Sequence, residues 1–261
     1  MINIVSRRGM EFMQSIKEQA LELHLAYIKE YHQLIIEEAT HTKMEYGKFL
    51  SILLEKEIES RRANGVKHRL KAAKFPYMRY LEDFDRNKYD MRFFKKFDEL
   101  ETLHFIKNKE KIILVGTPGA GKTHYAIALG VKACMLGKSV MFTSAPNLII
   151  EIKEAMSLSH FNAYKRKFEK FDLIIIDEVG FVSFDKEGCE ILFNLLSNRN
   201  DKGAIIITTN LSFERWNEVF NDPVLTGAIV DRLAHKAHIL DISREDSHRF
   251  EETVAWLKTK E

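Results

Sequence analysis

The strongest constraint on the fold is a glycine-rich segment that joins an apolar run to a helical pattern. Residues 116–123 read GTPGAGKT and fit the motif GxxxxGK[ST]. The apolar run 112–115 precedes them, and a helical pattern follows from Thr123 to Gly130. Glycines let backbone N–H groups converge on phosphate oxygens, and a helix N-terminus adds a favourable field for an anion. The segment predicts a phosphate-binding loop, with a chance glycine-rich turn as the alternative.

Four short apolar segments predict a parallel sheet. They are rich in branched side chains and span residues 112–115, 140–143, 173–176 and 204–208. Strands that are apolar on both faces are typical of a sheet covered by helices on both sides. The interval between the second and third segments is near 30 residues long, enough for more than one helix. We therefore expect an α/β fold in which helices sandwich a parallel sheet.

The first hundred residues have a different pattern of apolar residues, which predicts helices. Apolar residues recur at helical spacing from Met10 to Ala63, with a possible break near Thr40–Thr42. Pro76 ends the next helical stretch because proline cannot continue a helix. The expected domains are an N-terminal helical domain (1–65), a basic linker (66–110) and the α/β domain (111–261). Several aromatic residues of the first domain are expected in its core, with a docking surface as the alternative: Phe12, Tyr27, Tyr31, Tyr46 and Phe49.

Two acidic residues follow the third apolar segment. Asp177 and Glu178 come directly after 173–176, at the carboxyl end of a predicted strand, where ligands bind in such sheets. Asp177 is expected to hold Mg²⁺ through water, together with the hydroxyl of Thr123. Glu178 is placed to polarise a water for attack on a γ-phosphate. A strand-ending pair with only a solvent role is the alternative.

Further polar residues are candidates for the chemistry of phosphoryl transfer. Lys122 would reach the β- and γ-phosphates, and Asn210, after segment 204–208, could orient the attacking water or act as a helix N-cap. Arg232 is the candidate for a cation supplied to a neighbouring subunit, with a surface pair to Asp231 as the alternative. Arg199 is a second candidate for a role at a subunit interface.

Composition excludes several classes of protein. The 261 residues include 40 Lys and Arg against 38 Asp and Glu, so whole-chain charge does not indicate nucleic-acid binding. Two cysteines cannot build a disulfide framework, and we expect both to be reduced and buried. No apolar run approaches the ~20 residues that span a bilayer, and the N-terminus has no signal-peptide pattern. We therefore expect a cytoplasmic protein with no membrane partner and no metal besides Mg²⁺.

Local charge nevertheless identifies two candidate surfaces for DNA. The first set lies between Ser60 and Leu81, where there is no acidic residue, and consists of Arg61, Arg62, Lys67, Arg69, Lys71, Lys74 and Arg79. The second set precedes the third strand and consists of Lys153, Lys165, Arg166, Lys167 and Lys170. Contacts of this kind would be made with phosphates rather than bases. Solvated helix faces are the alternative for both sets, and Glu151, Glu154 and Glu169 would neutralise part of the second.

Several longer segments resemble one family. They read KAAKFP (71–76), LEDFD (81–85), GTPGAGKTHYAIALG (116–130), DLIIIDEVGFVSFDKEG (172–188), ITTNLSFERWNEVFNDPVL (207–225) and DRLAHKAHILDI (231–242). Together they resemble the IstB family, AAA+ ATPases encoded beside a transposase in bacterial insertion sequences. The resemblance covers roughly residues 45–250. The bacterial helicase loaders DnaC and DnaI are similar to this family.

The resemblance implies an ATP- and Mg²⁺-dependent transposition helper with an AAA+ fold. Such proteins assemble as oligomers on duplex DNA, bend it and deliver it to the transposase. The residues implied at the nucleotide are Gly116, Thr117, Pro118, Gly119, Ala120, Gly121, Lys122, Thr123 and His124. Arg232 matches the position of the trans-acting arginine, and the second basic set matches a channel-lining helix. The alternatives are a helicase loader and a nucleotide-gated scaffold without turnover, which would have no need of Glu178.

Overall fold

The computed structural model describes residues 14–180 and 184–242. The chain divides into two compact units, residues 1–68 and 69–261. Two arginines near the C-terminus, Arg244 and Arg249, lie outside the described residues. In the described part, no helix is both long enough and apolar enough to cross a membrane.

The first unit is helical, as its sequence pattern predicts. Residues 14–22 form a helix, followed by α2 (Ala26–His41) and by α3 (Tyr46–Ala73), which runs through the division between the units. The break expected near Thr40–Thr42 is confirmed, because α2 ends at His41.

A buried carboxylate joins the two long helices of this unit. Glu57 on α3 is 3% exposed, and its oxygens accept hydrogen bonds from the backbone N–H groups of Ala26, Tyr27 and Ile28. These donors open α2, whose own N-cap residue supplies no side-chain bond. Arg61 donates to Glu57 at 3.2 Å and to the carbonyl of His24 at 3.1 Å. Glu57 on α3 thus caps the N-terminus of α2, and its negative charge interacts favourably with the positive end of the α2 dipole.

The aromatic residues of the first unit do not all enter its core. Tyr46 is 91% exposed and Tyr31 is 46% exposed, so the expectation that they are core residues is wrong. Only a few apolar side chains, among them Ala20, Ile28 and Ile35, are buried there. Three helices of this length leave little interior for large rings. Phe12 lies outside the described residues.

The second unit contains a five-stranded parallel sheet in the order β2-β3-β4-β1-β5. Its strands are β1 (Lys111–Val115), β2 (Val140–Ser144), β3 (Leu173–Val179), β4 (Ala204–Thr209) and β5 (Ala237–Asp241). The four predicted strands are confirmed. The edge strand β5 was not predicted, because it is only half buried over its first three residues and contains His238.

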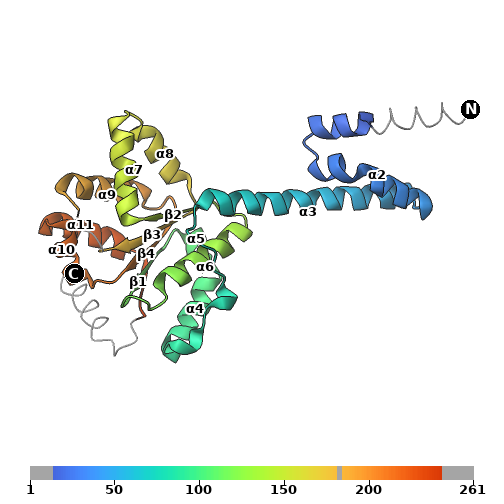
Figure 1. Cartoon of the computed structure of the whole chain (residues 1–261). Coiled ribbons are helices and arrows are strands. Elements are labelled where there is room, and N and C mark those ends of the chain that lie inside the picture. Colours follow the sequence, from blue (N-terminus) through green and yellow to red (C-terminus); the bar gives the residue numbers. More distant parts are fainter. Residues whose placement is uncertain (1–13, 181–183, 243–261) are drawn as a thin grey trace, which may run out of the picture. The chain divides into compact units, whose positions relative to one another are not determined.

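Helices cover both faces of the sheet (Figure 1). Ile113, Ile174 and Ile205 point to one face, which is covered by the helices α7 (Ala145–Ser157), α8 (Phe161–Lys170), α9 (Lys186–Arg199), α10 (Asn217–Phe220) and α11 (Pro223–Ala234). Ile112 and Ile175 point to the other face, which is covered by α4 (Phe94–Glu101), α5 (His104–Asn108) and α6 (Lys122–Met135). The predicted sandwich is confirmed, and α7 and α8 are the two helices expected before β3.

Residues 66–110, expected as a basic linker, are built into folded elements instead. After α3 ends at Ala73, short 3₁₀ turns span 81–83, 86–88 and 91–93 and lead into α4 and α5. Phe84, Phe97 and Phe105 are buried in the same core as α6. Burial of large aromatic rings stabilises this segment on the sheet.

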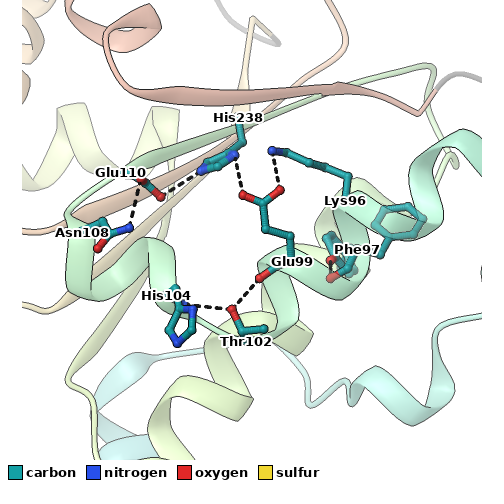
Figure 2. A network of polar contacts seen from close by, with 9 residues as sticks. Lys96, Phe97, Glu99, Thr102, His104, Asn108, Glu110 and His238 are labelled. Atoms are coloured by element: carbon teal, nitrogen blue, oxygen red, sulfur yellow. Dashed lines mark hydrogen bonds and ion pairs between the residues drawn. The ribbon is translucent and has the colours of Figure 1, made fainter.

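A polar network attaches the unpredicted strand β5 to α4 (Figure 2). His238 on β5 bonds Glu110 through Nε2 at 2.9 Å, and its Nδ1 lies 3.8 Å from Glu99 on α4. Lys96 donates to Glu99 at 2.8 Å, which is the main reason that the pKa of Glu99 is lowered. The bond to His238 is likewise the main cause of the lowered pKa of Glu110.

The cap made by Glu57 predicts a large effect of one substitution. Glu57→Ala should lower the free energy of unfolding by about 2 kcal/mol, because backbone donors that open α2 lose a charged acceptor. Urea unfolding of the full chain, followed by far-UV circular dichroism, measures this loss. Glu59→Ala is the matched control, since Glu59 is exposed and, among the described residues, its one ion pair is with exposed Lys56. It should change stability by less than about 0.5 kcal/mol. Equal effects would contradict the cap.

Candidate nucleotide-binding site

The glycine-rich loop joins β1 to α6, as the sequence predicts. Gly119 and Gly121 both have positive φ, 77° and 90°, and Gly121 is the N-cap of α6. No atom lies within 4 Å of the position that a side chain on Gly119 would occupy. The loop therefore keeps open space in front of the helix N-terminus, where backbone N–H groups can bind a phosphate.

Tyr89 supports the loop from behind. Its hydroxyl donates to the carbonyl of Ala120 at 2.7 Å, and its ring stacks on Phe84 at 5.1 Å between centroids. A side chain on Gly121 would collide with the Tyr89 hydroxyl, so glycine is required there for space as well as for its φ. Sequence reasoning missed Tyr89, because no motif connects residues 32 apart in the chain with this loop.

Asp177 lies at the carboxyl end of β3, 6% exposed, and meets the loop there. The hydroxyl of Thr123 donates to its Oδ1 at 2.9 Å. The hydroxyl of Thr208 on β4 donates to the same oxygen. The structure thus brings the two residues expected at Mg²⁺, Thr123 and Asp177, into direct contact.

Glu178 has an unusual backbone that exposes its side chain. Its φ is 60°, and the pairing of β3 with β4 shifts register between Ile176 and Val179. Such a bulge re-aims one side chain out of the ladder, and Glu178 is exposed between two buried neighbours. Its N–H donates to the hydroxyl of Thr208 at 3.0 Å.

Lys122 is half-buried beside these carboxylates. Its ammonium donates to the carbonyls of Gly116 (2.7 Å) and Thr117 (2.9 Å). Burial lowers the pKa of Lys122, while the nearby carboxylates, with Asp177 first, oppose the shift. A lysine held in the loop in this way can exchange its carbonyl partners for phosphate oxygens.

Asn210 follows β4 and lies at the same edge of the sheet. A side chain on Gly180, just after β3, would come within 3.4 Å of its Oδ1. The alternative that Asn210 is a helix N-cap is wrong, because the next helical turn spans Phe213–Trp216 and its cap position is Ser212. Asn210 is therefore available to the site.

The two candidate arginines occupy different environments. Arg232 is exposed on α11 and lines a surface groove with Asn200 and His235. Arg199 is fully buried at the end of α9 and donates to three backbone carbonyls, those of Phe168, Phe171 and Ala204. Burial lowers the pKa of Arg199 to about 10. The structure does not support an interface role for Arg199, because its side chain is buried inside the protomer. Both terminal nitrogens of its guanidinium donate to backbone carbonyls, and its Nε has no partner among the described residues.

A hollow lies between the loop and the segment that was expected to be a linker. Phe84, Tyr89 and His124 contribute rings to it, and Arg79, Asp83, Asp85, Lys88, Gly119 and Gly121 complete the lining. His124 meets Phe84 edge-on at 5.7 Å between ring centroids. Among the described residues, its Nε2 has no hydrogen-bond partner. Aromatic walls beside a phosphate loop suit a flat base.

The first basic set is divided between the two units. Arg61, Arg62 and Lys67 belong to the first unit, and the others to the second. Arg61 is engaged with Glu57, and Arg69 donates to the carbonyl of Cys134 at 2.9 Å. Lys74 lies 3.6 Å from Glu151. Six members of the set are exposed and Arg69 is half-buried; the exposed ones are Arg61, Arg62, Lys67, Lys71, Lys74 and Arg79.

Four members of the second basic set belong to α8, the helix labelled in Figure 1: Lys165, Arg166, Lys167 and Lys170. Lys153, on α7, is paired with Asp185 at 2.6 Å. Arg166, Lys167 and Lys170 are exposed, and in the part of the chain that the structure describes they form no ion pair. Two of the three carboxylates expected to neutralise them pair with other lysines, Glu151 with Lys74 and Glu169 with Lys202. The third, Glu154, forms no ion pair with the described residues. A free positive face therefore remains on α8.

Comparison with known proteins identifies the family. The profile of the IstB-like ATP binding protein family matches residues 18–255. The chain belongs to this family. The resemblance inferred from the motifs is thereby confirmed. An IstB-like relative from Pseudomonas aeruginosa, named as an ATP-binding protein of insertion sequence IS21, is 35% identical over 91% of this chain and 88% of its own length. The ATP-binding protein of insertion sequence IS5376 in Geobacillus stearothermophilus is 34% identical over 92% of this chain and 95% of its own length.

Solved structures confirm the AAA+ fold of this IstB-like chain. DnaA from Aquifex aeolicus, bound to AMPPCP, has a TM-score of 0.55 at 20% identity. The match covers 71% of this chain and 56% of the DnaA chain. The DnaC helicase loader has a TM-score of 0.51 at 18% identity, and the match covers 67% of this chain and 98% of the DnaC chain. At these identities the likeness shows the fold alone.

The contact between Tyr89 and the loop predicts the effect of a side chain on Gly121. Gly121→Ala should abolish measurable nucleotide binding, because the added methyl both strains a φ of 90° and collides with the Tyr89 hydroxyl. Gly137→Ala is the control, since it has a similar φ of 86° but open space around it. Binding of a fluorescent ATP analogue distinguishes them. Normal binding by Gly121→Ala would refute the packing argument.

Proposed function

We propose that this IstB-like protein is an ATPase that assembles on duplex target DNA, remodels it and delivers it to the transposase of its insertion sequence. ATP would be hydrolysed at the interfaces between subunits. The observation that carries the proposal is the contact of Thr123 with Asp177, beside an exposed Glu178. A protein that only bound nucleotide would not need a carboxylate aimed at open space beyond the phosphate loop.

The residues at the loop fit ATP with Mg²⁺. A hydroxyl and a carboxylate that converge within 2.9 Å supply the oxygen ligands that Mg²⁺ prefers. When bound, the ion would offset the charge of the phosphates. Thr123 and Asp177 would hold it, and the base would lie in the hollow lined by Phe84, Tyr89 and His124.

Lys122, Glu178 and Asn210 would each have a separate role in ATP hydrolysis. Lys122 would leave the carbonyls of Gly116 and Thr117 and donate to the phosphates. Glu178 would accept a hydrogen bond from water and orient it for attack, and Asn210 would hold the same water or the γ-phosphate. These residues lie at the carboxyl ends of β1, β3 and β4, where ligands bind in open parallel sheets.

Arg232 would complete the site of a neighbouring subunit. It is exposed on α11, so its guanidinium is available to a second copy. A cation delivered in trans stabilises the charge that develops during phosphoryl transfer and makes hydrolysis depend on assembly. Self-association would therefore be part of the activity.

The charge on α8 and the names of the relatives support two partners, duplex DNA and a transposase. Arg166, Lys167 and Lys170 present a free positive face on α8, which suits the phosphates of duplex DNA. The relatives are named for their insertion sequences, which supports a transposase as the protein partner. The competing function, loading of a replicative helicase, would favour single strands.

Glu178→Gln separates binding from hydrolysis. The variant should bind ATP with unchanged affinity but hydrolyse it about 100-fold more slowly, because an amide cannot accept the proton from water. Steady-state phosphate release and binding of a fluorescent ATP analogue measure the two properties. Glu190→Gln, an exposed change on α9, is the matched control. Undiminished turnover in Glu178→Gln would show that the assigned role is wrong.

Assembly on DNA tests the function as a whole. Sedimentation with a non-hydrolysable ATP analogue, at fixed salt, should show large assemblies with a duplex of about 50 base pairs and not with the matching single strand. Preference for the single strand would support the helicase-loader function instead.

The positive face of α8 predicts the salt dependence of this binding. Replacing Arg166, Lys167 and Lys170 by Ala should weaken duplex binding and reduce the slope of log affinity against log salt by up to about 3, because each neutralised phosphate releases a counterion. Lys138→Ala, at an exposed lysine before β2, is the control. An unchanged slope in the triple variant would place the DNA elsewhere.

A further inference from the structure

A buried hydroxyl lies between the phosphate loop and the acidic strand. Thr208, the last but one residue of β4, is 1% exposed. Its neighbour Thr209 is in register with Val115 of β1 on one side and with Val179 of β3 on the other. Thr208 therefore stands beside the bulge of β3, where the ladder between the two strands is interrupted.

The hydroxyl of Thr208 contacts both acidic residues of that bulge. It donates its proton to Oδ1 of Asp177 and accepts the backbone N–H of Glu178 at 3.0 Å. The register shift removes the N–H of Glu178 from regular pairing with β4. The hydroxyl thus replaces a missing ladder bond and satisfies a buried carboxylate in the same place.

We propose that Thr208 is a positioning residue for ATP hydrolysis, through which the strand β4 holds both the Mg²⁺-binding carboxylate of Asp177 and the backbone that presents Glu178. This inference rests on the proposed ATPase function. A non-glycine residue with a φ of 60° persists only when its surroundings hold it there, and Thr208 supplies the hydrogen bond that does so.

The bond to Asp177 has a separate consequence. Oδ1 accepts from Thr208 and from Thr123, so two hydroxyls set the direction of the carboxylate. When Thr123 turns its hydroxyl oxygen toward Mg²⁺, Thr208 remains to orient Asp177. Partners of this kind around a metal ligand are worth about 10- to 100-fold in metal affinity or activity.

Thr209, the next residue of β4, does not share the contacts of Thr208 with the acidic residues. Thr209 is also buried, but its hydroxyl accepts the N–H of Leu211 at 3.1 Å and contacts neither acidic residue in the bonds that the structure describes. A general need for threonine on β4 therefore does not explain the arrangement.

The test compares variants of the full chain at this position. Thr208→Val removes the hydroxyl and keeps the shape, Thr208→Ala removes it without adding a methyl beside the carboxylate, and Thr208→Ser keeps it. Thr226→Val is the matched control, since Thr226 is equally buried, on α11, and bonds only the carbonyl of Asp222. For each variant we would measure kcat and KM for ATP, and the affinity for a fluorescent ATP analogue with Mg²⁺ and with EDTA.

Thr208→Val, or Thr208→Ala if the former does not fold, should lose about 10- to 100-fold in kcat and most of the gain in affinity that Mg²⁺ provides. Affinity in EDTA should stay within about 2-fold, because the phosphate loop is untouched. Thr208→Ser and Thr226→Val should behave as the wild type in both measurements. A general loss of folding would instead lower affinity in EDTA as well.

Two outcomes would overturn the inference. One is a Thr208→Val or Thr208→Ala protein with normal kcat and a normal Mg²⁺ effect on binding. The other is a Thr208→Ser protein as impaired as Thr208→Val, which would show that shape and not the hydroxyl matters. If the wild-type protein itself does not hydrolyse ATP, the proposed function fails, while the Mg²⁺ effect on nucleotide binding still decides whether Thr208 orients Asp177.

Discussion

The site depends on the position of β4 between β1 and β3. Thr209 is in register with Val115 and with Val179, so the phosphate loop and the acidic strand end on either side of the same residue. This register allows Thr123 to reach Asp177 across a strand that belongs to neither motif. Because hydrogen bonds act only near 3 Å, a shift of one residue along β4 would disconnect the two motifs.

The sheet can hold this register because both of its faces are buried. Alternate residues of each central strand enter separate apolar cores, so slippage by one residue would not expose polar groups but would misalign every packed side chain. Arg199 reinforces one end of the arrangement by joining α9 to the carbonyls of Phe168, Phe171 and Ala204. The polar contacts of His238 do the same for β5 and α4. Polar groups at the ends of elements thus complement a uniformly apolar interior.

The bulge at Glu178 shows how the fold can expose one carboxylate within an otherwise buried strand. A regular central strand of this sheet buries every residue, as β1 and β4 do, and pairs its N–H groups with the neighbouring strands. Here the strand departs from that pattern for one residue, exposes Glu178, and transfers its N–H to the Thr208 side chain. The strained residue is held by a buried hydroxyl, and among the described residues its carboxylate has no partner that would compete with water. Strain at a functional position is stabilised by the packing around it.

Local sequence was enough to predict the family, the glycine-rich loop and four of the strands, because each depends on a short motif or on a periodicity within one element. It also predicted that Lys122, Thr123, Asp177 and Glu178 lie at the carboxyl ends of these strands. Tertiary structure alone decided the rest. The roles of Tyr89 and Thr208, the burial of Arg199 and the strand β5 depend on contacts between residues far apart in the chain. An arginine or a threonine has the same local pattern whether it meets solvent, a carbonyl or a carboxylate, and only the packed fold selects among these partners.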